Sequence, residues 1–477
     1  MPRTGFKASP ALQIEIQDQR PIYLPGDTLN GFILSDKKPS TLPHSLQSIR
    51  LKFFGRAKTK CVVKSGNSTS IYRGRAVFIQ VTKIIHKDHI CETGQHAWPF
   101  SMTIPEHPTP SIASRGDAFD PSPPFIFTRD PQTKQETDVT QHQLPSIMYY
   151  YDESGWSGKK IQAYIEYVLL AEAGSTKAVM PLYVRRQSVP SPITSHAMQL
   201  RPFSQETKTL ALLPEYAEGS APFGMKLKSI LRPSKTPKYS YSIMVAYPAT
   251  IQLEHPKTLP FKIYLVPHLD SKVTTISPEG SSLEQLPVVT VTSMEVELKS
   301  HVHIRCPGTF SDHSAAKHHT YHISGRSLST PIAVPIIPKS DSEPKQSQET
   351  ATLFSFNQYT ASKQETTIPS AALDLGTLFS VFLGARSAKR QIYPTFATYN
   401  IAVSHSLKWK VNLSCAGEKH SVSGEPVVTV LAPSEEQEEM KMRQLGTEGM
   451  KKSHDELEAG AEAAINLVGQ IMQAVTS

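Results

Sequence analysis

Short runs of alternating apolar and polar residues recur through the first part of the chain and predict β-strands. Successive side chains of a strand point to opposite faces, so alternation is typical of a strand with one buried face. The predicted strands are Leu12–Ile16, Leu29–Leu34, Ile49–Phe54, Ala76–Ile85, Phe100–Ile104, Ile161–Leu170 and Val179–Val184. Pro, Gly, Ser or Asp bounds each run, which indicates the short strands of a β-sandwich.

A second series of strand patterns runs from Ser242 to Leu431, and the segments between and after the two series differ in composition. Residues 191–240 are rich in proline and predict a connector with little regular structure. Residues 311–370 are polar and lack a sustained apolar period, so we expect a mobile insert. Beyond residue 433, glutamates are followed by apolar residues at helical spacing, which predicts an amphipathic helix over residues 450–475.

The pattern therefore predicts an all-β protein with two antiparallel, immunoglobulin-like β-sandwich domains in tandem and a C-terminal helical tail. The expected boundaries are residues 1–190 for the first sandwich, 191–240 for the connector, 241–433 for the second sandwich and 434–477 for the tail. A chain of 477 residues, 39% of them hydrophobic, has enough apolar material for two cores. Its 38 prolines disfavour long helices.

The sequence lacks the features of a membrane-spanning or secreted protein. No stretch approaches the roughly 18 consecutive apolar residues of a membrane helix, and the start Met1-Pro2-Arg3-Thr4-Gly5 lacks the apolar core of a secretory signal. The cysteines form no close pair of the kind that binds zinc or carries redox chemistry, so we expect reduced structural thiols. They are Cys61, Cys91, Cys306 and Cys415. We expect a cytoplasmic protein without metal or cofactor.

A turn signal, Leu24-Pro25-Gly26-Asp27, precedes the strand that begins at Leu29. Proline presets one backbone torsion, glycine is free to take a positive φ, and aspartate favours turns. Two further strand blocks follow in order, Ser48–Thr59 and His96–Pro105. In this order and spacing the three blocks resemble the N-terminal domain of arrestins, especially the fungal-type alpha-arrestin trafficking adaptors.

The resemblance extends over most of residues 10–433. The loop at Gln143–Ile147 and the following strand are similar to the end of the family's first domain, with Pro-Ser-Ile standing for Pro-Pro-Ser-Phe. Three blocks resemble the second arrestin domain: Pro260–Pro267, Tyr393–Ile401 and His405–Leu413. The resemblance implies a non-enzymatic adaptor that connects membrane transporters or receptors to a ubiquitin ligase of the HECT class for endocytosis.

One short motif, Leu213-Pro214-Glu215-Tyr216, is of the Leu-Pro-x-Tyr type that WW domains bind. Proline biases its neighbours toward an extended left-handed helix, which is cheap to order and lays proline and tyrosine into an aromatic groove. The resemblance implies that such a motif recruits WW-containing ligases. A chance match is the alternative, since the chain has 38 prolines and 17 tyrosines and nearby leucines could pack the segment down.

A basic segment between Arg50 and Lys87 contains ten cations and no acidic residue. Guanidinium and ammonium groups make charge-assisted hydrogen bonds to phosphate and carboxylate, so we expect this segment to hold an anionic cytoplasmic tail of a membrane protein. The candidate residues are Arg50, Lys52, Arg56, Lys58, Lys60, Arg73 and Arg75. The alternatives are a solvated sheet face and contact with an anionic membrane surface. Nucleic acid is disfavoured, because aromatics such as Phe53 and Phe78 stand at buried-face positions.

No catalytic signature is present, neither a Gly-rich phosphate loop, nor a nucleophile elbow, nor a zinc-binding His-Glu-x-x-His helix. The histidines of the polar insert, His313, His318, His319 and His322, favour a His-rich loop over a metal site. We therefore expect an arrestin-like adaptor that is recruited to plasma membrane and endosomes. The alternative is an arrestin-fold scaffold or coat component, similar to the retromer subunit of that fold, that works without a ligase.

Overall fold

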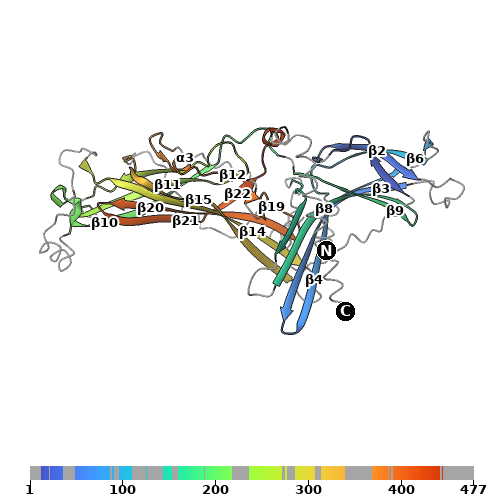
Figure 1. Ribbon diagram of the computed structural model, residues 1–477, viewed down its shortest axis with the longest axis horizontal. Coiled ribbons are helices and arrows are strands. Elements are labelled where there is room, and N and C mark those ends of the chain that lie inside the picture. Colours follow the sequence, from blue (N-terminus) through green and yellow to red (C-terminus); the bar gives the residue numbers. More distant parts are fainter. Residues whose placement is uncertain are drawn as a thin grey trace, which may run out of the picture.

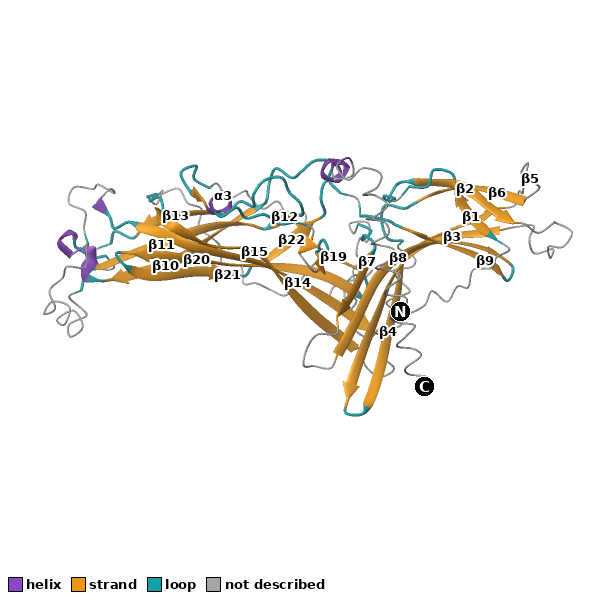
Figure 2. Ribbon diagram, viewed as in Figure 1, coloured by secondary structure: helices purple, strands orange, loops and turns teal. Residues whose placement is uncertain are grey.

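The computed structural model shows an elongated, almost entirely β-stranded molecule (Figures 1 and 2). It describes residues 12–20, 22–35, 49–85, 89–90, 96–109, 125, 143–152, 159–186, 188–216, 236–270, 274–276, 285–306, 313–338, 368–384, 386–387, 390–440 and 443. The described strands form two β-sandwiches that follow each other along the chain. The predicted fold class, tandem antiparallel sandwiches, is confirmed.

The first sandwich packs a four-stranded sheet against a five-stranded sheet. The four-stranded sheet has the order β1 (Gln13–Ile16), β2 (Thr28–Ser35), β6 (His96–Thr103), β5 (His89–Ile90). The five-stranded sheet has the order β4 (Ser68–Ile85), β3 (Ile49–Ser65), β8 (Lys159–Ala173), β7 (Met148–Asp152), and β9 (Thr176–Leu182) also pairs with β8. Both sheets contribute to one core, in which Ile33, Phe53 and Trp98 are buried.

The predicted turn before β2 is confirmed. Gly26 takes a φ of +92°, and the amide of Leu24 donates to the Asp27 carboxylate at 2.7 Å. The amide of Gly26 donates to the carbonyl of Ile104 at 2.8 Å, so the turn also joins the end of β6. A side chain at residue 26 would be strained, because only glycine readily adopts this φ.

The second sandwich also consists of two sheets, of four and seven strands. The first has the order β10 (Met198–Lys208), β11 (Lys238–Pro248), β13 (Lys262–Pro267), β16 (Leu373–Asp374). The second has the order β12 (Thr250–Gln252), β22 (Val427–Leu431), β20 (Ile401–Cys415), β14 (Val289–Cys306), β15 (His313–Ala333), with β19 (Phe396–Ala397) and β21 (Glu418–Gly424) beside β20. The small elements are η4 (Leu210–Leu212), η5 (Pro214–Tyr216), α3 (Leu375–Leu378), β17 (Arg386–Ser387) and β18 (Arg390–Gln391).

Two expectations about polar segments are wrong where the structure describes them. The connector at 191–240 contains β10, which pairs with β11 over its whole length. Pro202 is tolerated there because β10 is an edge strand, whose outer N–H positions need no ladder partner. The insert at 311–370 contains the 21-residue strand β15, which is mostly polar: positions 313–320 alternate between half-buried and exposed, and Tyr321 is buried in the second core. The domain boundaries themselves stay a prediction.

The tail is described only at its beginning. Residues 435–440 are helical, and Ser434 and Gln437 form a capping box. The Gln437 side-chain oxygen accepts from the amide of Ser434 at 2.7 Å, and the Ser434 hydroxyl oxygen accepts from the amide of Gln437 at 3.3 Å. The predicted amphipathic helix at 450–475 lies outside the described residues. No described helix is long and apolar enough to cross a membrane.

The two sandwiches share strands. One end of β14 and one end of β20 leave the core around Trp409 and enter the core of the first sandwich. There Val302, Ile304, Ile401 and Val403 are buried beside residues of β3 and β8. The Asn400 side chain donates to the carbonyl of Ala57 at 3.3 Å across the same boundary.

Candidate functional site

The predicted cations of β3 lie on the face of the five-stranded sheet that is turned away from the core. Ile49, Leu51, Phe53 and Cys61 point into the core, so the even-numbered positions of the strand point to the other face. This outer face carries the candidate residues Arg50, Lys52, Arg56, Lys58, Lys60, Arg73 and Arg75, the last two from β4. The structure therefore brings the sequence-predicted cations together.

Arg56 and Lys58 are buried on this face and share one carboxylate. Their side chains are 2% and 3% exposed, and both form ion pairs with Glu166 of β8, at 2.7 Å for Lys58. Phe54 and Tyr164 lie under them, with cation-to-ring distances of 5.1 and 5.3 Å. Because Arg56 and Lys58 are buried and paired with Glu166, we do not expect them to contact a ligand.

Burial is the largest cause of the pKa shifts of Arg56, Lys58 and Tyr164. It lowers the pKa of Lys58 to about 8, against the opposing attraction of Glu166. The pKa of Arg56 is also lowered by burial, again opposed by Glu166. The hydroxyl of Tyr164 has a raised pKa, chiefly because it is buried and then because Glu166 is close.

The positive charge of Lys52 is also balanced by a carboxylate. Lys52 contacts Glu172 of β8 at 2.6 Å, and Lys177 of β9 contacts the same carboxylate at 3.0 Å. Burial favours the neutral form of Glu172, but hydrogen bonds from the two ammonium groups outweigh it and lower its pKa. Sequence analysis missed Glu166 and Glu172 as counter-ions, because they lie more than 100 residues away along the chain.

Four candidate cations remain. Arg50 stands opposite Glu172 in the β3–β8 ladder. The other three, Lys60, Arg73 and Arg75, have no such neighbouring carboxylate in the described ladders. Lys60 stands directly opposite Arg73 in the β3–β4 ladder, and Arg75 stands opposite the buried Lys58. None of the three has an ion-pair partner in the part of the chain that the structure describes. The pKa of Lys60 is lowered by partial burial and then by the positive charges of Arg73 and Lys160. Like charges directly across a ladder are destabilising unless an opposite charge lies nearby.

The predicted WW-binding motif is not extended. Pro214–Tyr216 form the 3₁₀ helix η5, closed by a hydrogen bond from the amide of Tyr216 to the carbonyl of Leu213 at 2.9 Å. The preceding Leu212 is buried in the second core. The expectation that connector prolines keep this motif extended is wrong, because the chain coils into η4 and η5 at the end of β10 and Leu212 is anchored in the second core. Glu215 is exposed and Tyr216 half-buried.

The arrestin-like blocks at Leu144–Ile147 and Tyr393–Phe396 meet at the junction of the two sandwiches. The hydroxyl of Tyr393 donates to the carbonyl of Tyr149 at 2.6 Å, and Tyr167 donates to the carbonyl of Pro145 at 2.5 Å. The Tyr393 bond joins the two sandwiches, and the Tyr167 bond holds the loop at 143–147 against the first.

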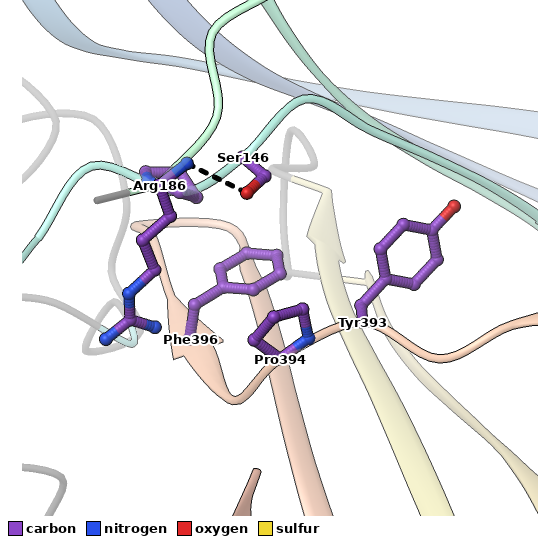
Figure 3. A pocket seen from close by; sticks show the side chains of 6 residues that line it. Ser146, Arg186, Tyr393, Pro394 and Phe396 are labelled. Atoms are coloured by element: carbon purple, nitrogen blue, oxygen red, sulfur yellow. Dashed lines mark hydrogen bonds between the residues drawn. The ribbon is translucent and has the colours of Figure 1, made fainter. Parts of the chain in front are cut away.

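A small pocket lies in this junction, lined by Pro145, Ser146, Arg186, Tyr393, Pro394 and Phe396 (Figure 3). It encloses about 10 Å³, the lower limit for a single water molecule. Arg186 crosses the junction: its amide donates to the Ser146 hydroxyl at 2.9 Å and its guanidinium to the carbonyl of Thr395 at 2.6 Å. The pocket is therefore too small to hold a substrate or cofactor.

The four histidines of the insert do not converge. His313 stacks on Tyr72, with ring centroids 3.3 Å apart, and His319 lies 2.9 Å from the carboxylate of Asp152. His318 and His322 occupy positions of opposite parity to His313 and His319 in β15 and so point to the other face. Among the described residues no group of three His, Cys, Asp or Glu side chains could hold a metal. The described cysteines Cys61, Cys306 and Cys415 are buried thiols outside any disulfide.

The described part of the chain is thus a pair of tandem β-sandwiches with a basic outer face on the first. Residues 12–118 match the family model of the arrestin (or S-antigen) N-terminal domain. This first domain is therefore similar to the N-terminal domain of arrestins, and the match does not test the alpha-arrestin subtype. A search of curated proteins found no match.

Proposed function

We propose that this protein is an arrestin-like trafficking adaptor that binds anionic cytoplasmic segments of membrane proteins. The observation that carries the proposal is the group of three uncompensated cations, Lys60, Arg73 and Arg75, on the outer face of an arrestin-type first sandwich. Phosphate and carboxylate groups bind guanidinium and ammonium pairs through short charge-assisted hydrogen bonds. The arrestin family match supports an adaptor rather than a chemical role, and the proposal includes a cytoplasmic location with recruitment to membranes.

Peptide binding tests this proposal. The double charge reversal Arg73→Glu/Arg75→Glu should reduce the affinity for an acidic phosphoserine peptide at least tenfold at low salt, with a smaller loss at high salt. The matched control is Lys410→Glu/Lys419→Glu, which makes the same charge change at exposed positions of the second sandwich. Equal loss in both variants would mean a general charge effect and would refute the site. Binding to vesicles with anionic lipid instead of peptide would assign the face to the membrane.

Recruitment of a WW-domain ligase through Leu213, Pro214, Glu215 and Tyr216 is the finer part of the proposal. WW grooves take an extended segment, so docking requires η5 to open first. Tyr216→Ala should abolish WW binding and cargo ubiquitylation while thermal stability changes little. Binding that persists in this variant would leave the motif without a role.

The folded state of η5 favours a second candidate, a scaffold or coat component that binds cargo without a ligase. A motif held in a 3₁₀ turn next to the buried Leu212 is less available than a free connector. Affinity purification from cells discriminates the two: stoichiometric assembly with other coat subunits supports the scaffold, and a ligase that depends on Tyr216 supports the adaptor.

A further inference from the structure

The segment after the first sandwich holds the start of the C-terminal helix. The amides of Glu435 and Glu436 donate to the carbonyls of Val189 and Pro190, both at 3.1 Å. We call this contact between residues 185–190 and residues 433–438 the clasp. The helix it holds is the short coil at the top centre of Figure 2.

Three side-chain interactions stabilise the clasp. The hydroxyl of Ser188 donates to the carbonyl of Pro433, and the guanidinium of Arg185 pairs with the carboxylate of Glu438. On the other side, the Gln437 amide donates to the carbonyl of Glu254 in the second sandwich. The clasp therefore joins the first sandwich, the second sandwich and the tail at one place.

The sequence through Ser188 is Arg185-Arg186-Gln187-Ser188-Val189, which contains the only Arg-Arg pair of the chain. Basophilic protein kinases select a serine with arginines two and three residues before it and an apolar residue after it, because carboxylates in the kinase groove pair with the guanidinium groups. Val189 supplies the apolar position and is 39% exposed. The neighbouring Ser191 is exposed as well but has no arginine before it at those positions.

We propose that Ser188 is a phosphorylation site and that its modification opens the clasp. A basophilic kinase transfers the γ-phosphoryl group of ATP to the Ser188 oxygen: the new P–O bond forms as the bond to the bridging oxygen breaks, ADP leaves, and the hydroxyl proton passes to the kinase's carboxylate base. This inference goes beyond the proposed function and does not depend on it.

Three physical effects of the phosphate act in the same direction. The modified Ser188 can no longer donate to the carbonyl of Pro433. Its charge of about −2 competes with Glu438 for Arg185. It also stands beside the start of a helix that carries Glu435, Glu436, Glu438 and Glu439, where added negative charge repels. The amides of Glu435 and Glu436 already have linker carbonyls as partners, so they do not compensate the phosphate.

Access to Ser188 requires this segment to detach transiently, because Arg185, Arg186 and Ser188 are half-buried and engaged in the closed form. Arg186 must also leave its partners Gln143 and Thr395. The kinase would capture the open form, and the phosphate would then keep it populated. Loosening the clasp without changing the recognition motif should therefore speed phosphorylation. Glu438→Gln does this, since it removes the ion pair with Arg185 and leaves residues 185–189 intact.

Phosphate incorporation tests the site. The purified full chain, incubated with a basophilic kinase and labelled ATP, should take up phosphate at Ser188, several-fold faster in Glu438→Gln. Ser188→Ala should remove this uptake and Ser191→Ala should leave it unchanged. Absence of phosphate at Ser188 in both the unaltered protein and Glu438→Gln would overturn the proposal.

Hydrogen exchange tests the consequence. In the phosphorylated protein the amides of Glu435 and Glu436 should exchange at least about tenfold faster, and phosphatase treatment should restore slow exchange. Amides in the core strand β20 serve as the reference for global stability. Phosphate at Ser188 with unchanged exchange at residues 435 and 436 would refute the opening of the clasp.

Discussion

At the scale of single residues, the outer face of the first sandwich separates two kinds of cation. Glu166 neutralises the buried charges of Arg56 and Lys58. In contrast, Lys60, Arg73 and Arg75 have no carboxylate partner among the described residues. A run of cations in the sequence predicts only that positive charge gathers on one sheet. The distinction between structural and available cations depends on β8, which the chain reaches about a hundred residues later.

Glu166→Gln should destabilise the protein strongly. Removing one partner of a buried ion pair leaves uncompensated charge, which costs about 3 to 5 kcal/mol, and here two cations lose the same partner. Urea unfolding measures the effect. The control is Glu206→Gln, which breaks an exposed pair with Lys208 and should change the free energy of unfolding by less than about 0.5 kcal/mol. Similar values for both variants would contradict the structural role of Glu166.

His405 should make the protein sensitive to acid. Burial lowers its pKa to about 3, and its Nε2 donates to the carbonyl of Tyr393 at 2.9 Å. Because the folded-state pKa lies below the unfolded value, its contribution is fully present above about pH 6.5 and is lost as the pH falls toward 3. At pH 5 the loss is about 2 kcal/mol relative to pH 7.

The variant His405→Gln tests this, since the amide can still donate to Tyr393 but does not titrate. Its free energy of unfolding should fall less between pH 7 and pH 5 than that of the unaltered protein. Parallel pH profiles for the two proteins would show that another group controls acid sensitivity.

At the scale of elements, sequence patterns located most strands of the first sandwich because alternation and turn signals coincide there. They ended β3 at Phe54, whereas the strand continues to Ser65. Beyond Phe54 the core face carries the small residues Gly55, Ala57 and Thr59, and the outer face carries cations, so the apolar alternation fades. The patterns missed β10 and β15 for a related reason. Both are edge strands with polar faces, and their partners β11 and β14 supply the ladder that local composition does not reveal.

The candidate site could be predicted in part. The two-residue period of a strand predicts that the cations of β3 share one face. The counter-ions Glu166 and Glu172 and the fold of residues 213–216 depend on tertiary packing, which the local sequence does not show. The Arg-Arg pair before Ser188 was the available signal for the clasp. The ion pair between Arg185 and Glu438 joins residues about 250 positions apart, which no single sequence shows.

The hairpin turn between β20 and β21 carries local strain that one substitution should relieve. Ala416 has a φ of +47° and Gly417 a φ of +82°, the combination of a type I′ turn. Asparagine tolerates this conformation better than alanine, so Ala416→Asn should raise the free energy of unfolding by roughly 0.5 to 1 kcal/mol. Thermal unfolding measures it. Gly417→Ala should have the opposite effect, and a stabilising Gly417→Ala would contradict the turn assignment.

At the scale of the whole molecule, the two sandwiches should unfold together. β14 and β20 contribute to both cores, so loss of either core removes strands from the other. We expect one transition in urea when Trp98 of the first core and Trp409 of the second are followed in single-tryptophan variants. Ile304→Ala, at a fully buried position, should lower both midpoints, corresponding to about 2 to 5 kcal/mol. Two separated transitions would show independent domains.

Because β14 and β20 contribute to both cores, we expect the two sandwiches to behave as one rigid, elongated body. A flexible linker lets two attached binding partners search a volume that depends on its length. Here β14 and β20 run from the core around Trp409 into the core that contains Ile304, and η5 lies beyond the far end of β10. A peptide gripped at Arg73 and a protein docked at Tyr216 would stay at a nearly constant separation. If both sites are used as proposed, the molecule would act as a spacer that selects partners whose reactive parts extend far enough to meet.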